Sequence, residues 1–63
     1  MEAFKNKRIK IIFNSNTGWI CETGPFIQVD HNFIVMINEL TKKIKYVNMQ
    51  CIKTIEIVGD INE

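Results

Sequence analysis

One stretch constrains the fold more than any other, the thirteen residues 26–38, FIQVDHNFIVMIN. Eight of its positions are apolar, and it contains neither Ala nor Leu. Residues 26–29 and 33–37 are almost all β-branched or aromatic, which favours strands, whereas the polar triplet 30–32 favours a turn or sharp bend. The stretch therefore predicts two strands that meet at a turn, and it places the chain in the all-β class.

Other segments repeat this pattern of alternation followed by turn residues. Ile9, Ile11 and Phe13 point one way and define a core face for a first strand, and Arg8, Lys10 and Ile12 point the other way. The next segment contains Gly24 and Pro25, so it forms either one long strand bent at Gly24 or two short strands. We predict a single domain over residues 1–63, a five-stranded, strongly bent antiparallel small barrel. Its expected strands are residues 7–13, 19–30, 33–39, 44–48 and 52–58.

The connections are expected to be short. Residues 14–18 supply five consecutive turn residues, and residues 39–43 form a second polar loop. Residues 48–51 do not alternate and predict a short turn of 3₁₀ type. Residues 1–6 are either a frayed end or a single helical turn, because they are too few for a stable helix.

A chain of 63 residues buries only about 60% of its unfolded surface, so a disulfide, a metal or self-association should supplement the core. Cys21 and Cys51 are isolated, and together with His31 they are fewer than the four ligands of a zinc site. No leader and no apolar run of about 20 residues is present. We therefore expect a cytoplasmic protein with no membrane segment, no metal, no cofactor and reduced, buried cysteines. Self-association remains as the supplement.

The third expected strand is apolar on both faces. Phe33, Val35 and Ile37 share one face and Ile34 and Met36 share the other, but only one face of a strand can look into the core of so small a chain. We assign Phe33 and its face to the core, and we expect a second copy of the chain to cover the rest. The predicted oligomer interface comprises Ile34, Met36, Val47, Met49 and Ile52.

No catalytic constellation is recognisable. Asp30 and His31 are adjacent, so on an extended strand they point to opposite faces, and they act together only where the backbone turns. We expect Asp30 to cap the bend and His31 to be solvated. The sequence contains no nucleophile elbow, phosphate loop or metal cluster, and we predict a protein that is not an enzyme.

The net charge of +1 provides no strong field for nucleic acid, but basic residues gather after the third strand. They mark either solvated strand tips or a rim that contacts phosphate. Trp19 and Tyr46 stand beside turns, where aromatic rings either belong to the core or stack on bases. If single-stranded nucleic acid binds, amides would read base edges, lysines would hold phosphate and an aromatic ring would stack. The corresponding residues are Asn32, Asn48, Gln50, Lys42, Lys43, Lys45 and Tyr46.

The order of these features resembles the Sm-like family of small barrels, including RNA chaperones of the Hfq type, over about residues 8–58. Gly18 and Gly24 stand near the positions of the family's turn and strand glycines, and residues 30–37, DHNFIVMI, resemble its D-N-F element and following strand. Residues 51–55, CIKTI, resemble the A-I-S-T-I ending of Hfq. The chain also resembles small proteins of spore-forming bacteria with a related core. It departs from Hfq at residues 48–50, NMQ, where Hfq has Tyr-Lys-His, and in its short N-terminal segment.

The resemblance implies a ring, in which the fourth strand of one copy pairs with the fifth strand of the next. It carries over a nucleic-acid role only to Asn32 and Phe33, in the D-N-F position, and to the turn at residues 48–50, and it does not carry over the Hfq ligand pocket, whose Tyr-Lys-His is replaced. Two functions therefore stay open. One is an oligomeric module that binds RNA or another single-stranded nucleic acid. The other is a structural or adaptor protein that binds protein partners through a strand edge or rim.

Overall fold

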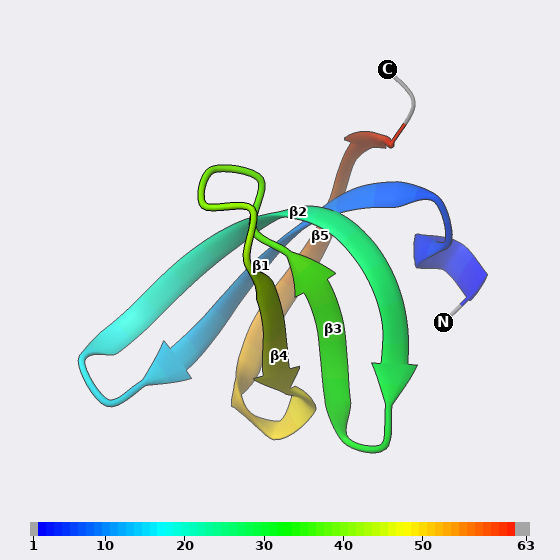
Figure 1. Ribbon diagram of the computed structural model, residues 1–63. Coiled ribbons are helices and arrows are strands. Elements are labelled where there is room, and N and C mark those ends of the chain that lie inside the picture. Colours follow the sequence, from blue (N-terminus) through cyan, green and yellow to red (C-terminus); the bar gives the residue numbers. More distant parts are fainter. Residues whose placement is uncertain (1, 62–63) are drawn as a thin grey trace.

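The computed structural model describes residues 2–61 and contains one strongly bent sheet of antiparallel strands (Figure 1). The predicted all-β class with five strands is confirmed. Two single 3₁₀ turns, η1 and η2, complete the described part of the chain. The elements are η1 Glu2–Phe4, β1 Lys7–Ser15, β2 Gly18–Asp30, β3 Phe33–Ile37, β4 Ile44–Asn48, η2 Met49–Cys51 and β5 Ile52–Asp60.

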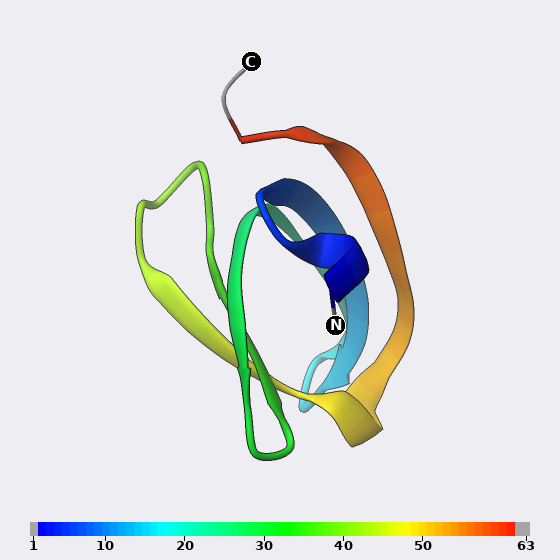
Figure 2. The same cartoon turned by 90° about the vertical axis from the view of Figure 1, so that its right-hand side faces the viewer.

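The strand order is β4-β3-β2-β1-β5, and β2 is shared by two halves of the sheet. Its first part pairs with β1, which pairs in turn with β5, and its second part pairs with β3, which pairs with β4. Figure 2 shows that the sheet curves so that β3 and β4 face β1 and β5 across the interior. β4 and β5 are thus the two edge strands, and β2 connects the halves.

The bend in β2 lies at Gly24, as the sequence predicts. The pairing of β1 with β2 ends at Arg8 and Pro25, and the pairing of β2 with β3 begins at Phe26. Gly24 is buried against the end of β3, where an added Cβ would lie 1.7 Å from the carbonyl oxygen of Ile37. Only a residue without a side chain allows this approach. Of the two alternatives, one long bent strand is therefore the one observed.

The core fills the space between the two halves. Ile9 and Ile11 of β1 are fully buried, and Phe13 packs against the cluster, which confirms the predicted core face of the first strand. Ile34 and Met36 of β3 are also fully buried. The remaining members of the buried cluster are Phe26 and Val47.

Several connections differ from the prediction by a few residues. The expected five-residue loop at 14–18 is a two-residue turn, because Ser15 pairs with Gly18 and the Ser15 hydroxyl accepts a hydrogen bond from the Thr17 amide at 3.2 Å. β3 ends at Ile37 rather than residue 39, because the Asn38 side-chain oxygen accepts hydrogen bonds from the Leu40 and Thr41 amides and so starts the loop. β5 continues to Asp60 because that residue still pairs with β1.

The chain start forms a single turn. η1 is one 3₁₀ turn rather than a helix, and the Phe4 ring packs against the Phe26 ring with centroids 5.8 Å apart. Residue 1, which belongs to the predicted N-terminal segment, lies outside the described residues. The expected 3₁₀ turn near residues 48–51 is confirmed as η2, which Asn48 caps by accepting a hydrogen bond from the Gln50 amide.

Candidate nucleic-acid interface

Two polar turns that are distant in sequence meet at one end of the sheet. The Met49 amide donates a hydrogen bond of 2.8 Å to the Asn32 carbonyl oxygen, which joins η2 to the β2–β3 turn. Asn48 is the direct partner of Phe33 in the ladder between β3 and β4. The Asn48 side-chain oxygen accepts a hydrogen bond from the Gln50 amide at 2.9 Å, which leaves the side-chain NH₂ group outside this cap. The structure thus brings Asn32, Asn48 and Gln50 together.

An exposed aromatic pair lies beside these amides. Phe33 is 39% exposed and Tyr46 is 59% exposed, and their ring centroids are 6.3 Å apart in an edge-to-face arrangement. The assignment of Phe33 to the core is therefore wrong. Met36 pairs with the buried Phe26, and Ile34 lies two residues from Met36 on the same side of β3, so that Ile34 rather than Phe33 points inward.

Five apolar side chains lie on the outer surface of this half, which we call the apolar face. They are Ile27, Phe33, Ile37, Ile44 and Tyr46. Val35 lies between them in the register but is only 3% exposed. Asp30 shares this side of the sheet at its turn, where its carboxylate lies 2.7 Å from His31 Nδ1.

Three residues of the predicted oligomer interface are buried within the chain itself. Ile34 and Met36 are fully buried and Val47 is 4% exposed, so these three cannot contact a second copy. Met49 and Ile52 are partly buried against the same core, and their part in an interface stays a prediction. The exposed apolar residues nearby are instead Phe33, Ile44 and Tyr46 of the apolar face.

The three predicted lysines lie toward the other end of β4. Lys42 and Lys43 belong to the loop before β4, which stands at the opposite end of the molecule from η2 in Figures 1 and 2. Lys45 is directed to Glu22, with its Nζ 4.0 Å from the carboxylate. The seven predicted residues therefore do not form one cluster. Six of them instead follow β4 from end to end, and we call them the β4 strip: Lys42, Lys43, Lys45, Tyr46, Asn48 and Gln50.

Asp30 and His31 do contact each other, because the backbone turns at this point. His31 has a positive φ of 55°, and its side chain is 92% exposed. The expectation of a solvated histidine is confirmed, and the carboxylate contact orients its ring.

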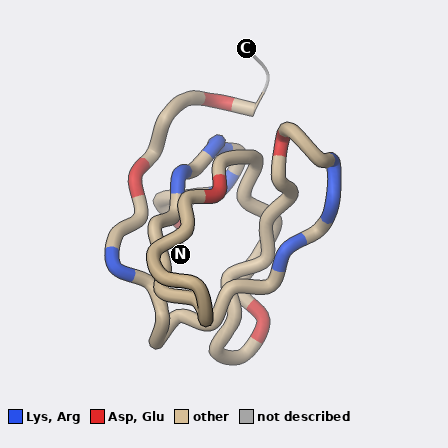
Figure 3. Tube along the Cα trace, turned by 90° about the vertical axis from the view of Figure 1, so that its left-hand side faces the viewer, with Lys and Arg blue, Asp and Glu red and all other residues tan. Residues whose placement is uncertain are grey.

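Charges are distributed around the molecule rather than gathered. Figure 3 shows basic and acidic segments interspersed along the chain trace. Arg8 forms a two-pronged ion pair with Glu39, with Nε–Oε2 and Nη2–Oε1 distances of 3.0 and 2.9 Å. The guanidinium of Arg8 holds the pKa of Glu39 below its ordinary value through this hydrogen bonding. This pair ties β1 to the segment after β3.

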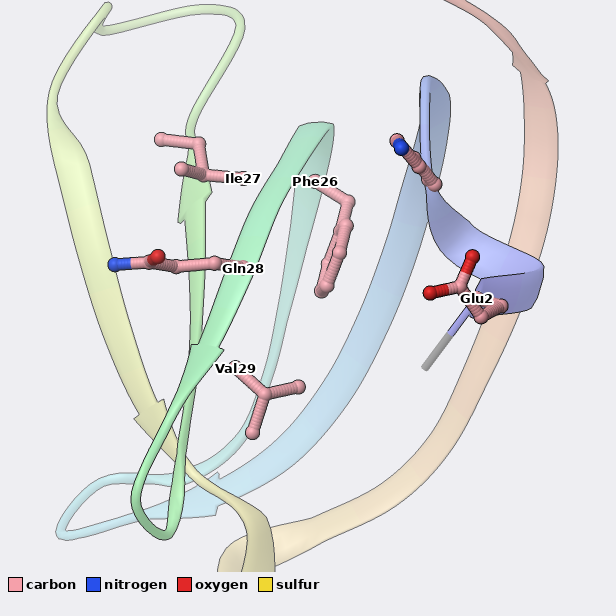
Figure 4. A pocket seen from close by; sticks show the side chains of 6 residues that line it. Glu2, Phe26, Ile27, Gln28 and Val29 are labelled. Atoms are coloured by element: carbon pink, nitrogen blue, oxygen red, sulfur yellow. The ribbon is translucent and has the colours of Figure 1, made fainter.

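A pocket lies between η1 and the second half of β2 and includes no residue of the β4 strip. Its volume is about 290 Å³, and six residues line it: Glu2, Lys5, Phe26, Ile27, Gln28 and Val29. Figure 4 shows Phe26 and Val29 pointing toward η1, while Ile27 and Gln28 point to the other side of the strand. Phe26 therefore both lines this pocket and belongs to the buried core cluster.

The cysteines and other potential metal ligands do not form a site in the described part of the chain. Cys21 and Cys51 are both free and exposed, so the expectation that they are buried is wrong. Within residues 2–61, no three side chains of the His, Cys, Asp and Glu types lie together as a metal would require. Over the same residues, no helix has the length and apolar character of a membrane span.

Comparison with protein-family models, with curated proteins and with solved structures finds no match to this chain. The site residues therefore rest on geometry and on the sequence pattern. The sequence left Tyr46 either in the core or at the surface, and it assigned Phe33 to the core although the family resemblance extends a nucleic-acid role to it. The available signal for Phe33 was its place directly after the polar turn.

Proposed function

We propose that this protein is a non-catalytic module that binds single-stranded nucleic acid along the β4 strip. One observation carries the proposal, the exposed pair of Phe33 and Tyr46 between the amide-rich turns and the lysine loop. Exposed rings on a sheet surface serve as platforms for bases, each worth about 1–3 kcal/mol by alanine substitution. The proposed RNA-binding residues are the six residues of the β4 strip together with Asn32 and Phe33.

The chemistry of the strip is ordered along β4. Lys42 and Lys43 carry the positive charge that phosphates need, Tyr46 offers a ring, and Asn48 and Gln50 offer amide groups to base edges. The strand spans five residues, or roughly 17 Å at about 3.3 Å per residue. That length suits a ligand of a few nucleotides.

Self-association is the second part of the proposal. β4 and β5 are edge strands, and β5 exposes Ile57 and Val58, while β4 exposes Ile44. Open apolar edges invite pairing with another chain, and contact between two unlike edges closes as a ring when its rotation allows. Pairing of β4 with β5 of a second copy, as the Sm-like resemblance implies, would remove both edges. Light scattering after size exclusion should then give a whole multiple of 7.4 kDa, and a monomer would reject the ring.

A protein adaptor is the alternative function. The net charge of +1 and the high exposure of Leu40 and Ile44 favour an apolar contact over a phosphate contact. The two functions differ in their response to salt, because phosphate contacts weaken steeply as salt rises and apolar contacts barely respond.

The test is fluorescence anisotropy with a labelled, unstructured oligouridylate across a salt series. Combined replacement of Lys42, Lys43 and Lys45 by Ala should abolish binding, because these residues supply the strip's phosphate contacts. A matched control replaces Lys5, Lys7 and Lys10 by Ala and removes the same charge from the other half of the sheet. Unchanged affinity in the first variant, or equal loss in both, would contradict the proposed site.

A further inference from the structure

Trp19 is exposed on the half of the sheet opposite the apolar face. It is 60% exposed, and the Lys53 Nζ stands over its ring, 5.2 Å from the centroid. Trp19 pairs with Asn14 in the ladder, and both neighbouring side chains on its side of the sheet, Asn14 and Cys21, are exposed. The ring thus has a cation over it and still exposes most of its surface. It is also the single tryptophan of the chain.

The Trp19 site lies at the same end of the molecule as the amides of the β4 strip. The β1–β2 turn, η2 and the β2–β3 turn all stand at this end in the two perpendicular views of Figures 1 and 2. The chain itself connects the two places, because β4 leads through η2 into β5 and Lys53 is the second residue of β5. Tyr46 and Lys53 are therefore joined by a continuous path that exposes Gln50 and Cys51.

We propose that Trp19 and Lys53 form a second contact for the same nucleic-acid strand, in which the indole stacks a base and the ammonium holds the adjoining phosphate. This inference rests on the proposed function and extends it from one face to two. The strand would run from Tyr46 past Asn48 and Gln50 and around η2 to Trp19. Indole is a strong partner for stacking and for cations, and a lysine beside it supplies the charge that a phosphate requires.

The geometry sets the length of the ligand. Tyr46 and Lys53 are seven positions apart in sequence, so their Cα atoms are at most about 25 Å apart on a fully extended chain. A stacked strand rises about 3.4 Å per nucleotide, so about eight nucleotides suffice to reach both contacts. A four-nucleotide ligand should occupy one contact, and a twelve-nucleotide ligand should occupy both.

Because the chain has one tryptophan, its fluorescence reports directly on the second contact. We would titrate the full chain with four- and twelve-nucleotide oligouridylates and follow Trp19 fluorescence, with anisotropy of the labelled oligomers as an independent measure of binding. The twelve-nucleotide ligand should quench Trp19. Trp19→Ala should weaken its binding about tenfold and leave the four-nucleotide affinity at the β4 strip nearly unchanged.

Two controls match the substitutions. Leu40→Ala removes another large exposed apolar side chain at the other end of the molecule and should leave the affinity unchanged. Lys53→Ala should lower the slope of log affinity against log salt by about one phosphate contact. Lys10→Ala removes a lysine that is paired with Glu56 and should leave this slope unchanged. Circular dichroism melts would verify that each variant folds.

The outcomes separate the two proposals. Quenching together with the length-dependent loss in Trp19→Ala supports the second contact. Binding of the twelve-nucleotide ligand without quenching, and with unchanged affinity in Trp19→Ala, overturns this inference and leaves the β4 strip intact. Absence of any anisotropy change with either ligand overturns both.

Discussion

The two outer surfaces of the bent sheet differ in how they meet solvent. On the β1–β5 side, Lys10 lies 3.9 Å from Glu56, and Lys7 pairs with Asp60. On the β3–β4 side, Phe33, Ile44 and Tyr46 are exposed side by side on the apolar face. Charged pairs mark a surface that water already satisfies, whereas an exposed apolar surface marks one that a ligand or partner covers. The difference teaches where binding should be sought first.

The largest expected effect breaks the junction between the two halves. In Gly24→Ala the new Cβ would collide with the Ile37 carbonyl oxygen, and the backbone would have to move. A cost above about 4 kcal/mol is expected, which is comparable to the whole stability of so small a chain. Urea denaturation followed by circular dichroism measures it, with Thr23→Ala as the neighbouring control. A midpoint close to that of the wild type would show that the halves do not need this contact.

The next effect separates the two faces of β3. Ile34→Ala removes a fully buried side chain and should cost about 2–5 kcal/mol. Phe33→Ala removes a partly exposed ring and its contact with Tyr46, and should cost about 1 kcal/mol. The same urea titration compares the two variants. The reverse order would mean that Phe33, rather than Ile34, faces the core.

A smaller effect concerns the ion pair that ties β1 to the segment after β3. Because Arg8 lowers the pKa of Glu39 in the folded protein, the pair stabilises the fold above the ordinary glutamate pKa, and this contribution is lost as pH falls through the lowered value. Arg8→Gln should therefore flatten the stability profile in that acidic window. Urea midpoints across the pH series measure it, and Lys5→Gln serves as the control. Parallel profiles for wild type and Arg8→Gln would contradict the linkage.

The smallest effect is expected on the charged side of the comparison. The pair of Lys10 and Glu56 is long and exposed, so Glu56→Gln should change the free energy of unfolding by less than about 0.5 kcal/mol. A thermal melt at low and high salt would detect the difference. A loss of several degrees would mean that this surface is held by its charges and is not merely solvated.

Much of the fold could be predicted from the sequence because strands and turns leave local signals. Alternation identified the inward residues Ile9 and Ile11, and glycine with proline marked the bend at Gly24. The orientation of β3 could not be predicted, since both of its faces are apolar and a one-residue shift in register exchanges them. The bulge at Ile27, which shifts the pairing of residues 28–30 with β3, also has no distinct signal in the sequence.

The candidate site was predicted in part. The sequence placed Asn32 and Asn48 in two separate turns. The structure brings these turns together, because the Met49 amide donates a hydrogen bond to the Asn32 carbonyl oxygen. Lys42 and Lys43 lie in the loop of the β3–β4 hairpin, and this loop stands at the opposite end of both strands from Asn32 and Asn48. The prediction of one joint site did not follow the geometry of its own hairpin. Exposure of Cys21 was also unpredictable, since an isolated cysteine occurs in cores and on surfaces alike.

The strand order also fixes the order in which the chain can fold. β2, β3 and β4 are neighbours in sequence and in space, so their pairing closes only short loops. β5 must travel back across almost the whole chain to pair Asp60 with Lys7. Because contacts distant in sequence form late, we expect the β2–β3–β4 hairpins to provide the nucleus and β5 to dock last. Until β5 docks, one edge of β1 is unpaired and can pair with another chain. We therefore expect aggregation to begin at this edge during refolding at high protein concentration.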